Sequence, residues 1–275
     1  MKSEVQKTVL ETIDEMYDKI FQAERKVADF VRKNPELVVN ANVSELANYS
    51  GVSDATVIRM CKHLGYEGYY QMKICLSGDL GGTSILLGRR NSSDTKMDYF
   101  RDIAEGILQT EAAVDEAVFN ESAELLKNST MVHLVGVGNT SPVCLYCGFR
   151  LERIGIRCTY DALPEYYMNH ISLASPTDVV LAISWSGTTR NVVSALKLAK
   201  EKGLKTVAVT AYQRSPVSAS ADYLLLSALE NGENGRMSQY SRMNEMAVVE
   251  ALIQAVAAGK DEISEPEMWL SELKY

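Results

Sequence analysis

The chain has 275 residues, a net charge of −8, and 46% apolar and 23% charged residues, which is the composition of an ordinary globular protein. Its length is enough for two domains or for one large one. No apolar stretch approaches the roughly 18 residues that a membrane helix needs, and the acidic residues near the start leave no apolar core for an export signal. We therefore expect a cytoplasmic protein that contacts no membrane.

The five cysteines are an odd number spread along the chain, which argues against a disulfide framework. Cys144 and Cys147 form a single CxxC pair, but no second pair and no nearby histidine completes a zinc site. We expect ordinary buried thiols in a reducing compartment, and we assign neither a metal nor a cofactor.

Residues 1–80 predict helices throughout, because their apolar residues recur at helical spacing. The Asn34-Pro35 step ends one of these helices, since the residue before a proline is pushed out of helical geometry. This region holds ten Lys and Arg against twelve Asp and Glu. Charge therefore neither supports nor excludes binding to DNA.

The segment SELANYSGVSDATVIRMCKHLG has the spacing of a helix-turn-helix. Ala47 is small enough for two helices to cross, and Gly51 can turn sharply four residues later. Ser53 is a favoured N-cap for the second helix. Apolar residues that would face inward occupy the remaining expected positions: Leu46, Val52, Val57 and Met60.

The start of that second helix would meet the major groove of DNA. We expect Ser53, Ala55, Thr56 and Arg59 to face outward there. Arg59 could pair with guanine or a phosphate, and Thr56 with a thymine methyl group or a phosphate. Lys62 and Tyr66 would hold the DNA backbone without reading sequence. The alternative is a helical pair that serves only in dimerisation.

Residues 78–94 are rich in Gly and Ser and lack periodicity, which is typical of a connector between domains. Beyond them, apolar runs alternate with helical segments. The expected strands are residues 131–137, 156–160, 178–184, 204–210 and 223–226. This alternation predicts a parallel sheet covered on both faces, and such sheets bind ligands at the carboxyl ends of their strands, where the strand order reverses.

A cluster of hydroxyl side chains follows the third expected strand, in SWSGTTRN at 184–191. The N-terminus of a helix offers unpaired N–H groups that can bind a phosphate, and Gly187 lets the backbone approach closely. The residues expected to bind are Ser184, Ser186, Gly187, Thr188 and Thr189, with Asn139 and Thr140 on the loop after the first strand. The alternative is that these hydroxyls only cap the helix.

Two sets of segments carry a resemblance to known families. GVGNT, ISWSGTTRN, AVTAYQRSPVSASADYLL and SRMNEMAVVEAL resemble the sugar isomerase (SIS) domain. ERKVADFVRKNPELV and SELANYSGVSDATVIRMCKHLGYEGYYQMK resemble the helix-turn-helix of the RpiR family. Together these segments span nearly the whole chain.

The resemblance implies an α/β fold class, with an all-α helix-turn-helix domain (1–77), a linker (78–94) and a flavodoxin-like parallel-sheet SIS domain (95–275). It implies a transcriptional regulator that binds a double-stranded DNA operator, acts as a homodimer or homotetramer and responds to a sugar phosphate. Ser215 and Glu233 are further candidates for contacting the sugar.

SIS domains also occur in sugar-phosphate isomerases, so an enzyme is the main alternative function. Isomerisation needs a base beside the carbonyl, commonly Glu or His. His63, His133 and His170 form no recognisable catalytic set with other residues, so we expect no catalytic site and no enzyme. A sugar-phosphate sensor that acts only through protein partners is a third possibility.

Overall fold

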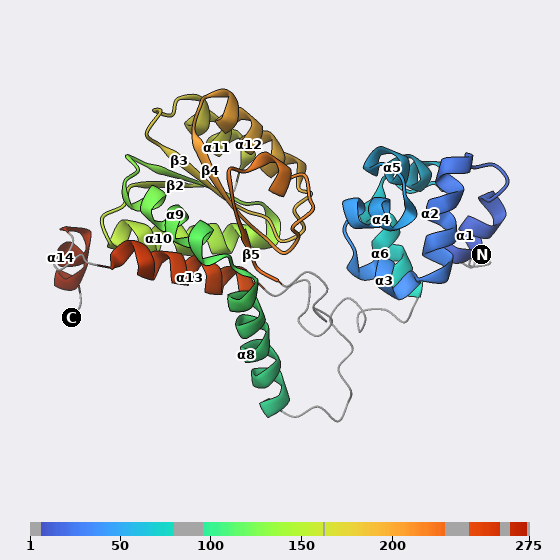
Figure 1. Cartoon of the computed structure of the whole chain (residues 1–275), viewed down its shortest axis with the longest axis horizontal. Coiled ribbons are helices and arrows are strands. Elements are labelled where there is room, and N and C mark those ends of the chain that lie inside the picture. The colour runs from blue at the N-terminus through green and yellow to red at the C-terminus, as the bar shows by residue number, and fades with distance from the viewer. Residues whose placement is uncertain (1–6, 80–95, 162, 229–241, 259–264, 274–275) are drawn as a thin grey trace, which may run out of the picture. The chain divides into compact units, whose positions relative to one another are not determined.

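The computed structural model describes residues 7–79, 96–161, 163–228, 242–258 and 265–273 (Figure 1). The chain forms two compact units, which meet in the sequence at Thr95 and Lys96. The last helix of the first unit runs to Asp79. Residues 78 and 79, expected at the start of the linker, are thus helical, and the remainder of the expected linker lies outside the described residues. No helix in the described ranges combines the length and apolarity needed to span a bilayer.

The described part of the first unit is helical. Its helices are α1 (Val9–Met16), α2 (Gln22–Lys33), α3 (Pro35–Asn40), α4 (Val43–Ser50), α5 (Asp54–His63) and α6 (Tyr69–Asp79). Helix α2 ends directly before Asn34-Pro35, as the sequence predicts. These helices surround one apolar core, to which α1, α2, α4, α5 and α6 each contribute fully buried side chains.

Helices α4 and α5 form the predicted helix-turn-helix. Gly51 ends α4 with a φ of 63°, a left-handed conformation that favours glycine. Ala47 is buried where the two helices meet, and Val57 and Met60 of α5 are fully buried beneath them. The Ser53 hydroxyl accepts a hydrogen bond from the N–H of Thr56 at 3.4 Å, which confirms Ser53 as the N-cap of α5.

A buried lysine lies in this helical core. Lys73 of α6 is 6% exposed, and its Nζ donates a hydrogen bond to the carbonyl oxygen of Ala41 at 2.9 Å. The hydroxyl of Tyr69 donates to the same carbonyl at 3.0 Å. Both side chains thus satisfy the open C-terminal end of α3. Burial lowers the pKa of Lys73 to about 8, and the nearby charge of Glu45 opposes this decrease.

The second unit is an α/β domain around one parallel sheet. Its strands are β1 (Val132–Val135), β2 (Cys158–Tyr160), β3 (Val179–Ile183), β4 (Lys205–Thr210) and β5 (Tyr223–Leu226), in the order β2-β1-β3-β4-β5. Every pairing is parallel. Its helices of eight or more residues are α8 (Lys96–Ala113), α9 (Glu116–Lys127), α10 (Ser141–Arg153), α11 (Pro164–Ser172), α12 (Arg190–Glu201), α13 (Met243–Ala257) and α14 (Glu265–Glu272). This strand order is that of flavodoxin-like folds.

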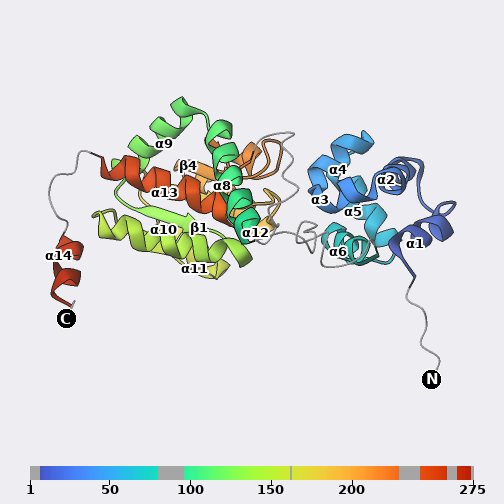
Figure 2. The same ribbon diagram turned by 90° about the horizontal axis from the view of Figure 1, so that it is seen from below.

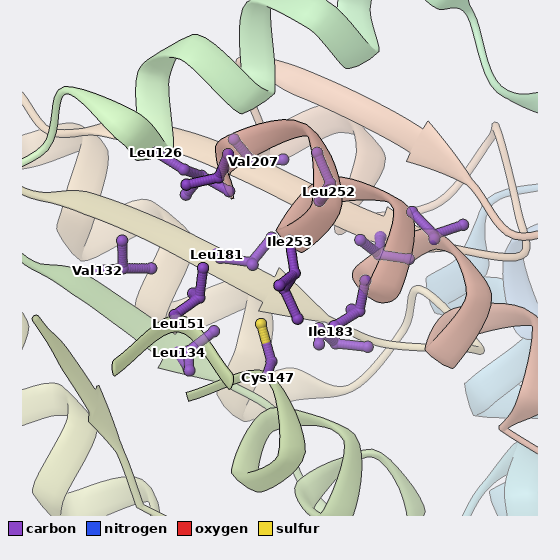
Figure 3. Packing of buried hydrophobic residues seen from close by; sticks show 14 of the residues in the cluster. Leu126, Val132, Leu134, Cys147, Leu151, Leu181, Ile183, Val207, Leu252 and Ile253 are labelled. Atoms are coloured by element: carbon purple, nitrogen blue, oxygen red, sulfur yellow. The ribbon is translucent and has the colours of Figure 1, made fainter. Parts of the chain in front are cut away.

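Helices cover both faces of the sheet. Helices α9, α10 and α13 lie over one face and α11 and α12 over the other (Figure 1), with α10 and α13 side by side (Figure 2). Leu134, Leu181 and Ile183 of the strands pack with Cys147 of α10 and Ile253 of α13 (Figure 3). A smaller core fills the opposite face. The continuous apolar sequences of β1, β3 and β4 therefore arise because these strands are buried on both sides.

The CxxC pair lies inside this core. Cys144 and Cys147 are free thiols that are 4% and 1% exposed on α10. Burial raises the pKa of the Cys144 thiol to about 12. Both are buried thiols, as predicted, and neither has the exposed, thiolate-favouring surroundings of a reactive cysteine.

Candidate functional site

Two loops meet at the carboxyl ends of β1 and β3. These strands are neighbours, and the strand order reverses at β1, because β2 flanks it on one side and β3 on the other. A Cβ atom placed on Gly136, directly after β1, would lie 3.3 Å from the carbonyl oxygen of Ile183, the last residue of β3. The loops that follow both strands therefore share the position at which parallel sheets bind ligands.

The loop after β3 presents its hydroxyl groups to one another. The N–H and the hydroxyl of Thr188 both contact the hydroxyl of Ser186, at 3.3 and 3.2 Å. Ser184 is 2% exposed and donates to the hydroxyl of Thr189 at 3.4 Å. Thr189 is the N-cap residue of α12, yet its side chain makes no capping hydrogen bond. The start of α12 therefore keeps the donors with which a helix binds an anion.

Gly187 brings a third segment against this loop. Its φ is 65°, and an added Cβ would lie 2.2 Å from the hydroxyl oxygen and 2.5 Å from the Cβ of Ser215. The N–H of Val217 donates to the carbonyl oxygen of Gly187 at 2.9 Å. Ser215 is 7% exposed, and its hydroxyl lies 2.6 Å from that of Ser218. The structure thus brings Ser215 to the predicted loop, where it packs behind Gly187.

The loop after β1 contributes one exposed and one buried candidate. Thr140 is 6% exposed, and its hydroxyl bonds to its own turn, accepting from the N–H of Val137 at 3.1 Å and donating to the carbonyl of Val137 at 2.9 Å. Asn139, the preceding residue, is exposed. Thr140 therefore shapes the turn that presents Asn139. Glu233, the remaining candidate for contacting the sugar, lies outside the described residues.

Sequence reasoning missed a cation beside the loop after β3. The guanidinium carbon of Arg242 lies 5.1 Å from the centre of the Trp185 ring, a cation–π distance. The ring of Tyr212 meets Trp185 edge-on, with the ring centres 5.5 Å apart. Arg242 directly precedes α13, almost sixty residues after Trp185 in the chain, so no local pattern identifies the contact.

Arg242 also connects the loop to a buried polar chain. Its Nη1 lies 3.7 Å from Oε2 of Glu245, a residue that is 1% exposed. Burial raises the pKa of Glu245, and the charge of Arg242 opposes this increase. Oε1 of Glu245 accepts from the Ser227 hydroxyl at 2.8 Å, and the carbonyl of Ser227 accepts from the hydroxyl of Thr110 on α8 at 2.9 Å. This series of polar contacts thus joins the loop after β3 to α13, to the end of β5 and to α8.

Of the two histidines of this unit, His133 lies away from the loops after β1 and β3. His133, in β1, is buried and lies 2.9 Å from the hydroxyl of Thr159 and 3.4 Å from Asp178, which directly precedes β3. His170 of α11 lies 3.4 Å from Asp161. The contact with Asp178 places His133 toward the amino ends of the strands, opposite the loops. Within the described residues, no three His, Cys, Asp or Glu side chains are grouped to hold a metal.

Helix α5 presents most, but not all, of the expected DNA-facing residues. Ser53, Ala55, Arg59 and Lys62 are exposed. Thr56 is 8% exposed, so the prediction that it faces outward was wrong: its side chain is covered within the first turn of α5, with its hydroxyl 3.1 Å from that of Ser53. Tyr66 is half-buried and packs against the core of the first unit.

A buried carboxylate holds two side chains of α5. Glu24, near the start of α2, is fully buried. Its Oε1 accepts from Nε of Arg59 and its Oε2 contacts Nδ1 of His63, both at 2.9 Å. Oε2 also accepts from the N–H of Phe21 at 3.0 Å. Burial alone would raise the pKa of Glu24, but the hydrogen bonds from His63, Phe21 and Arg59 outweigh it and lower that pKa.

Comparison with known proteins identifies both parts of the chain. The model of the rpiR-family helix-turn-helix domain matches residues 7–82, and the SIS domain model matches residues 125–255. An uncharacterized HTH-type transcriptional regulator of Caldanaerobacter subterraneus is 31% identical over 92% of this chain and 91% of its own length. The chain therefore belongs to the RpiR family of helix-turn-helix transcriptional regulators with an SIS domain.

Two further proteins resemble nearly the whole chain, one in sequence and one in fold. The HTH-type transcriptional regulator HexR of Pseudomonas aeruginosa is 28% identical over 91% of this chain and 89% of its own. The solved structure of the Vibrio vulnificus NanR protein, complexed with ManNAc-6P, has a TM-score of 0.80 to this chain and a sequence identity of 24%. The structural alignment covers 97% of this chain and 98% of the NanR chain. That likeness confirms the fold of a helical N-terminal region followed by the α/β domain.

Proposed function

We propose that this regulator binds a sugar phosphate at the loops after β1 and β3 and that the ligand controls its binding to an operator. The observation that supports the proposal most is the loop at 184–189. Its hydroxyls face one another at the uncapped start of α12, at the reversal of the strand order. Such a corner supplies hydroxyl and N–H donors to a tetrahedral anion without a lysine. The sugar phosphate bound by NanR, a structural neighbour, is of the same chemical class.

In this proposal the phosphate lies on Ser184, Ser186, Thr188 and Thr189, with Gly187 allowing close approach. Asn139 contacts the sugar from the loop after β1. Thr140 and Ser215 support these loops from behind, since the hydroxyl of Thr140 bonds to its own turn and Ser215 packs against Gly187. Trp185 closes one side, because Arg242 and Tyr212 both contact its ring.

DNA binding belongs to the exposed side of α5. Ser53, Ala55, Arg59 and Lys62 lie there on the second helix of the helix-turn-helix, which enters the major groove in this class of motif. Two copies of the chain, as a homodimer or within a homotetramer, would read half-sites about 34–36 Å apart. The ligand would change that spacing by binding one arrangement of the copies better than the other.

We propose regulation without catalysis. Isomerisation of a sugar phosphate needs a base at the bound carbon. In the described part of the second unit, His133 of β1 contacts Asp178 at the amino ends of β1 and β3, away from the loops. A purified protein that interconverts a hexose or amino-sugar phosphate would contradict this part of the proposal.

The proposal is tested with the Ser184→Ala, Ser186→Ala double variant and an operator selected from random duplexes. A thermal-shift screen of sugar phosphates first identifies a ligand, because a compound that binds only the folded state raises the melting temperature. The variant should lose the thermal shift and the ligand's effect on operator affinity, yet bind the operator with unchanged affinity in the absence of ligand.

Two results would count against the proposal. If the variant keeps the full thermal shift, the phosphate lies elsewhere. If no sugar phosphate shifts the wild-type protein at millimolar concentration, the loop is not an effector site. Circular dichroism of the variant confirms that its fold is intact.

A further inference from the structure

An apolar side chain lies within the polar outer face of α5. Ile58 is 39% exposed, although its neighbours Val57 and Met60 are fully buried. It follows Ala55 by one helical turn, so the two side chains lie on the same side of the helix. Arg59 and Lys62, which are also exposed, flank it. The outer face of α5 therefore presents two aliphatic groups beside two cations.

A single exposed isoleucine on an ordinary surface indicates no function, because such residues are common. Ile58 differs in its position, because the second helix of a helix-turn-helix inserts into the major groove. The C5 methyl group of thymine is the apolar group that base edges present there. Ala55 and Ile58 have no polar side-chain atom with which to bond a base edge, whereas they can cover such a methyl group.

The contact between Arg59 and Glu24 fixes the position of Arg59, the residue next to Ile58. Nε of Arg59 donates to the buried carboxylate of Glu24 at 2.9 Å, so the guanidinium is anchored on the side of α2. Its side chain still has 53% of its surface exposed. Held in this way, Arg59 is oriented as a phosphate contact, which positions the helix without reading sequence.

We propose that Ile58, together with Ala55, determines operator specificity by packing on thymine methyl groups in the major groove. Arg59, oriented by Glu24, and Lys62 bind the adjacent phosphates. The inference rests on the proposed DNA-binding function and adds the chemistry of base recognition. It proposes Ile58 in place of Thr56, which the sequence predicts to meet a thymine methyl group or a phosphate but which is 8% exposed.

The test uses the full-length protein and an operator obtained by selection from random duplexes. Each thymine is replaced in turn by deoxyuridine, which removes the C5 methyl group and keeps the base pair. We expect one or two positions per half-site at which uracil weakens wild-type binding about fourfold, the loss that corresponds to one buried methyl group. In Ile58→Ala this penalty should fall below about twofold at one of these positions, as expected when the two changes remove the same contact.

Lys62→Ala provides the matched control on the same face of α5. It should weaken binding to every duplex and lower the slope of log affinity against log salt concentration by about one, the value of one lost phosphate contact. It should leave the loss of affinity caused by uracil unchanged. Both substitutions are at exposed positions, and alanine favours helix, so equal melting temperatures check that the fold is retained.

The outcomes separate this inference from the function on which it rests. If selection enriches no sequence, the chain does not read DNA and the proposed function fails. If a sequence is enriched but no thymine methyl matters, or the uracil penalty is the same in Ile58→Ala as in the wild type, the assignment of Ile58 is overturned.

Discussion

Two features of Gly187 disfavour a side chain: its backbone conformation and the packing of neighbouring atoms against it. Its positive φ disfavours any side chain, and Ser215 occupies the place where a Cβ would lie. Gly203 has a positive φ of 76° as well, but an added Cβ there would meet nothing within 4 Å. The two glycines therefore separate backbone strain from crowding.

Gly187→Ala should destabilise the protein by about 2–4 kcal/mol, because strain and overpacking add. Gly203→Ala should cost only about 1 kcal/mol, the strain alone. Urea unfolding followed by circular dichroism measures both. Adding Ser215→Gly should recover part of the loss at Gly187, and no recovery would show that Ser215 is not the obstacle.

Lys73 makes the stability of the helical unit depend on pH. Its folded pKa of about 8 lies below that of an unfolded lysine. Between about pH 8 and 10 the unfolded chain binds more protons, so the free energy of unfolding should rise with pH across this window.

Lys73→Met should remove that rise, which we expect to be about 1–3 kcal/mol. Urea unfolding of both proteins at intervals from pH 7 to 10 tests it. The buried thiol of Cys61, with its pKa raised to about 12, acts in the opposite direction above about pH 9. Because both proteins contain Cys61, the difference between their curves isolates Lys73, and parallel curves would contradict the prediction.

Single residues also show where sequence reasoning was insufficient. The position of Ser53 was predictable, since N-caps follow from local chemistry. Thr56 was assigned to the wrong side, because local spacing alone does not say whether the third residue of a helix is covered or faces the solvent. Nothing near Glu24 in the sequence indicated that it binds Arg59, thirty-five residues away.

At the scale of elements, the contact between Trp185 and Arg242 joins the loop after β3 to the start of α13. Arg242 and Glu245 have side chains that are 9% and 1% exposed. Removing one charge of such a buried pair leaves the other without compensation, which is costly, whereas replacing both is often tolerated.

Arg242→Met should therefore destabilise the second unit by about 2–4 kcal/mol. The double variant with Glu245→Gln should recover at least half of that loss. Unfolding is best followed by fluorescence in a Trp269→Phe background, where Trp185 is the one tryptophan of the chain. Additive losses in the double variant would mean that the two charges do not stabilise each other.

The elements of the second unit were largely predictable. Each expected strand overlaps an observed one, because runs such as DVVLAIS are buried on both faces and carry no ambiguity of period. The loops after β1 and β3 could be assigned to one edge of the sheet, because the carboxyl ends of parallel strands lie at the same edge. The contribution of α13 could not be predicted, since Arg242 reaches the loop only through the packing of that helix on the sheet.

At the scale of the whole molecule, the described cores do not mix. One apolar cluster consists entirely of residues from Val9 to Leu76, and the clusters on the two faces of the sheet consist of residues from Val114 onward. Each unit thus has a core of its own, which is the physical requirement for independent folding.

A fragment of residues 96–275 should therefore fold alone. It should bind the sugar phosphate identified by the thermal-shift screen with an affinity within about threefold of that of the full chain, since its core and the proposed ligand residues lie within it. Calorimetry on both proteins measures this. A fragment that folds but binds more than tenfold more weakly would show that the helical unit contributes to the effector site.

The carboxylate between α2 and α5 has a consequence for the behaviour of the molecule in concentrated salt. Contacts to DNA weaken steeply as ionic strength rises, because the release of counterions from the phosphates on binding becomes less favourable. Fully buried, Glu24 is shielded from those ions, and its pairs are screened much less. A protein that dissociates from its operator at high salt should thus keep Arg59 and His63 of α5 in place and rebind on dilution without rearrangement.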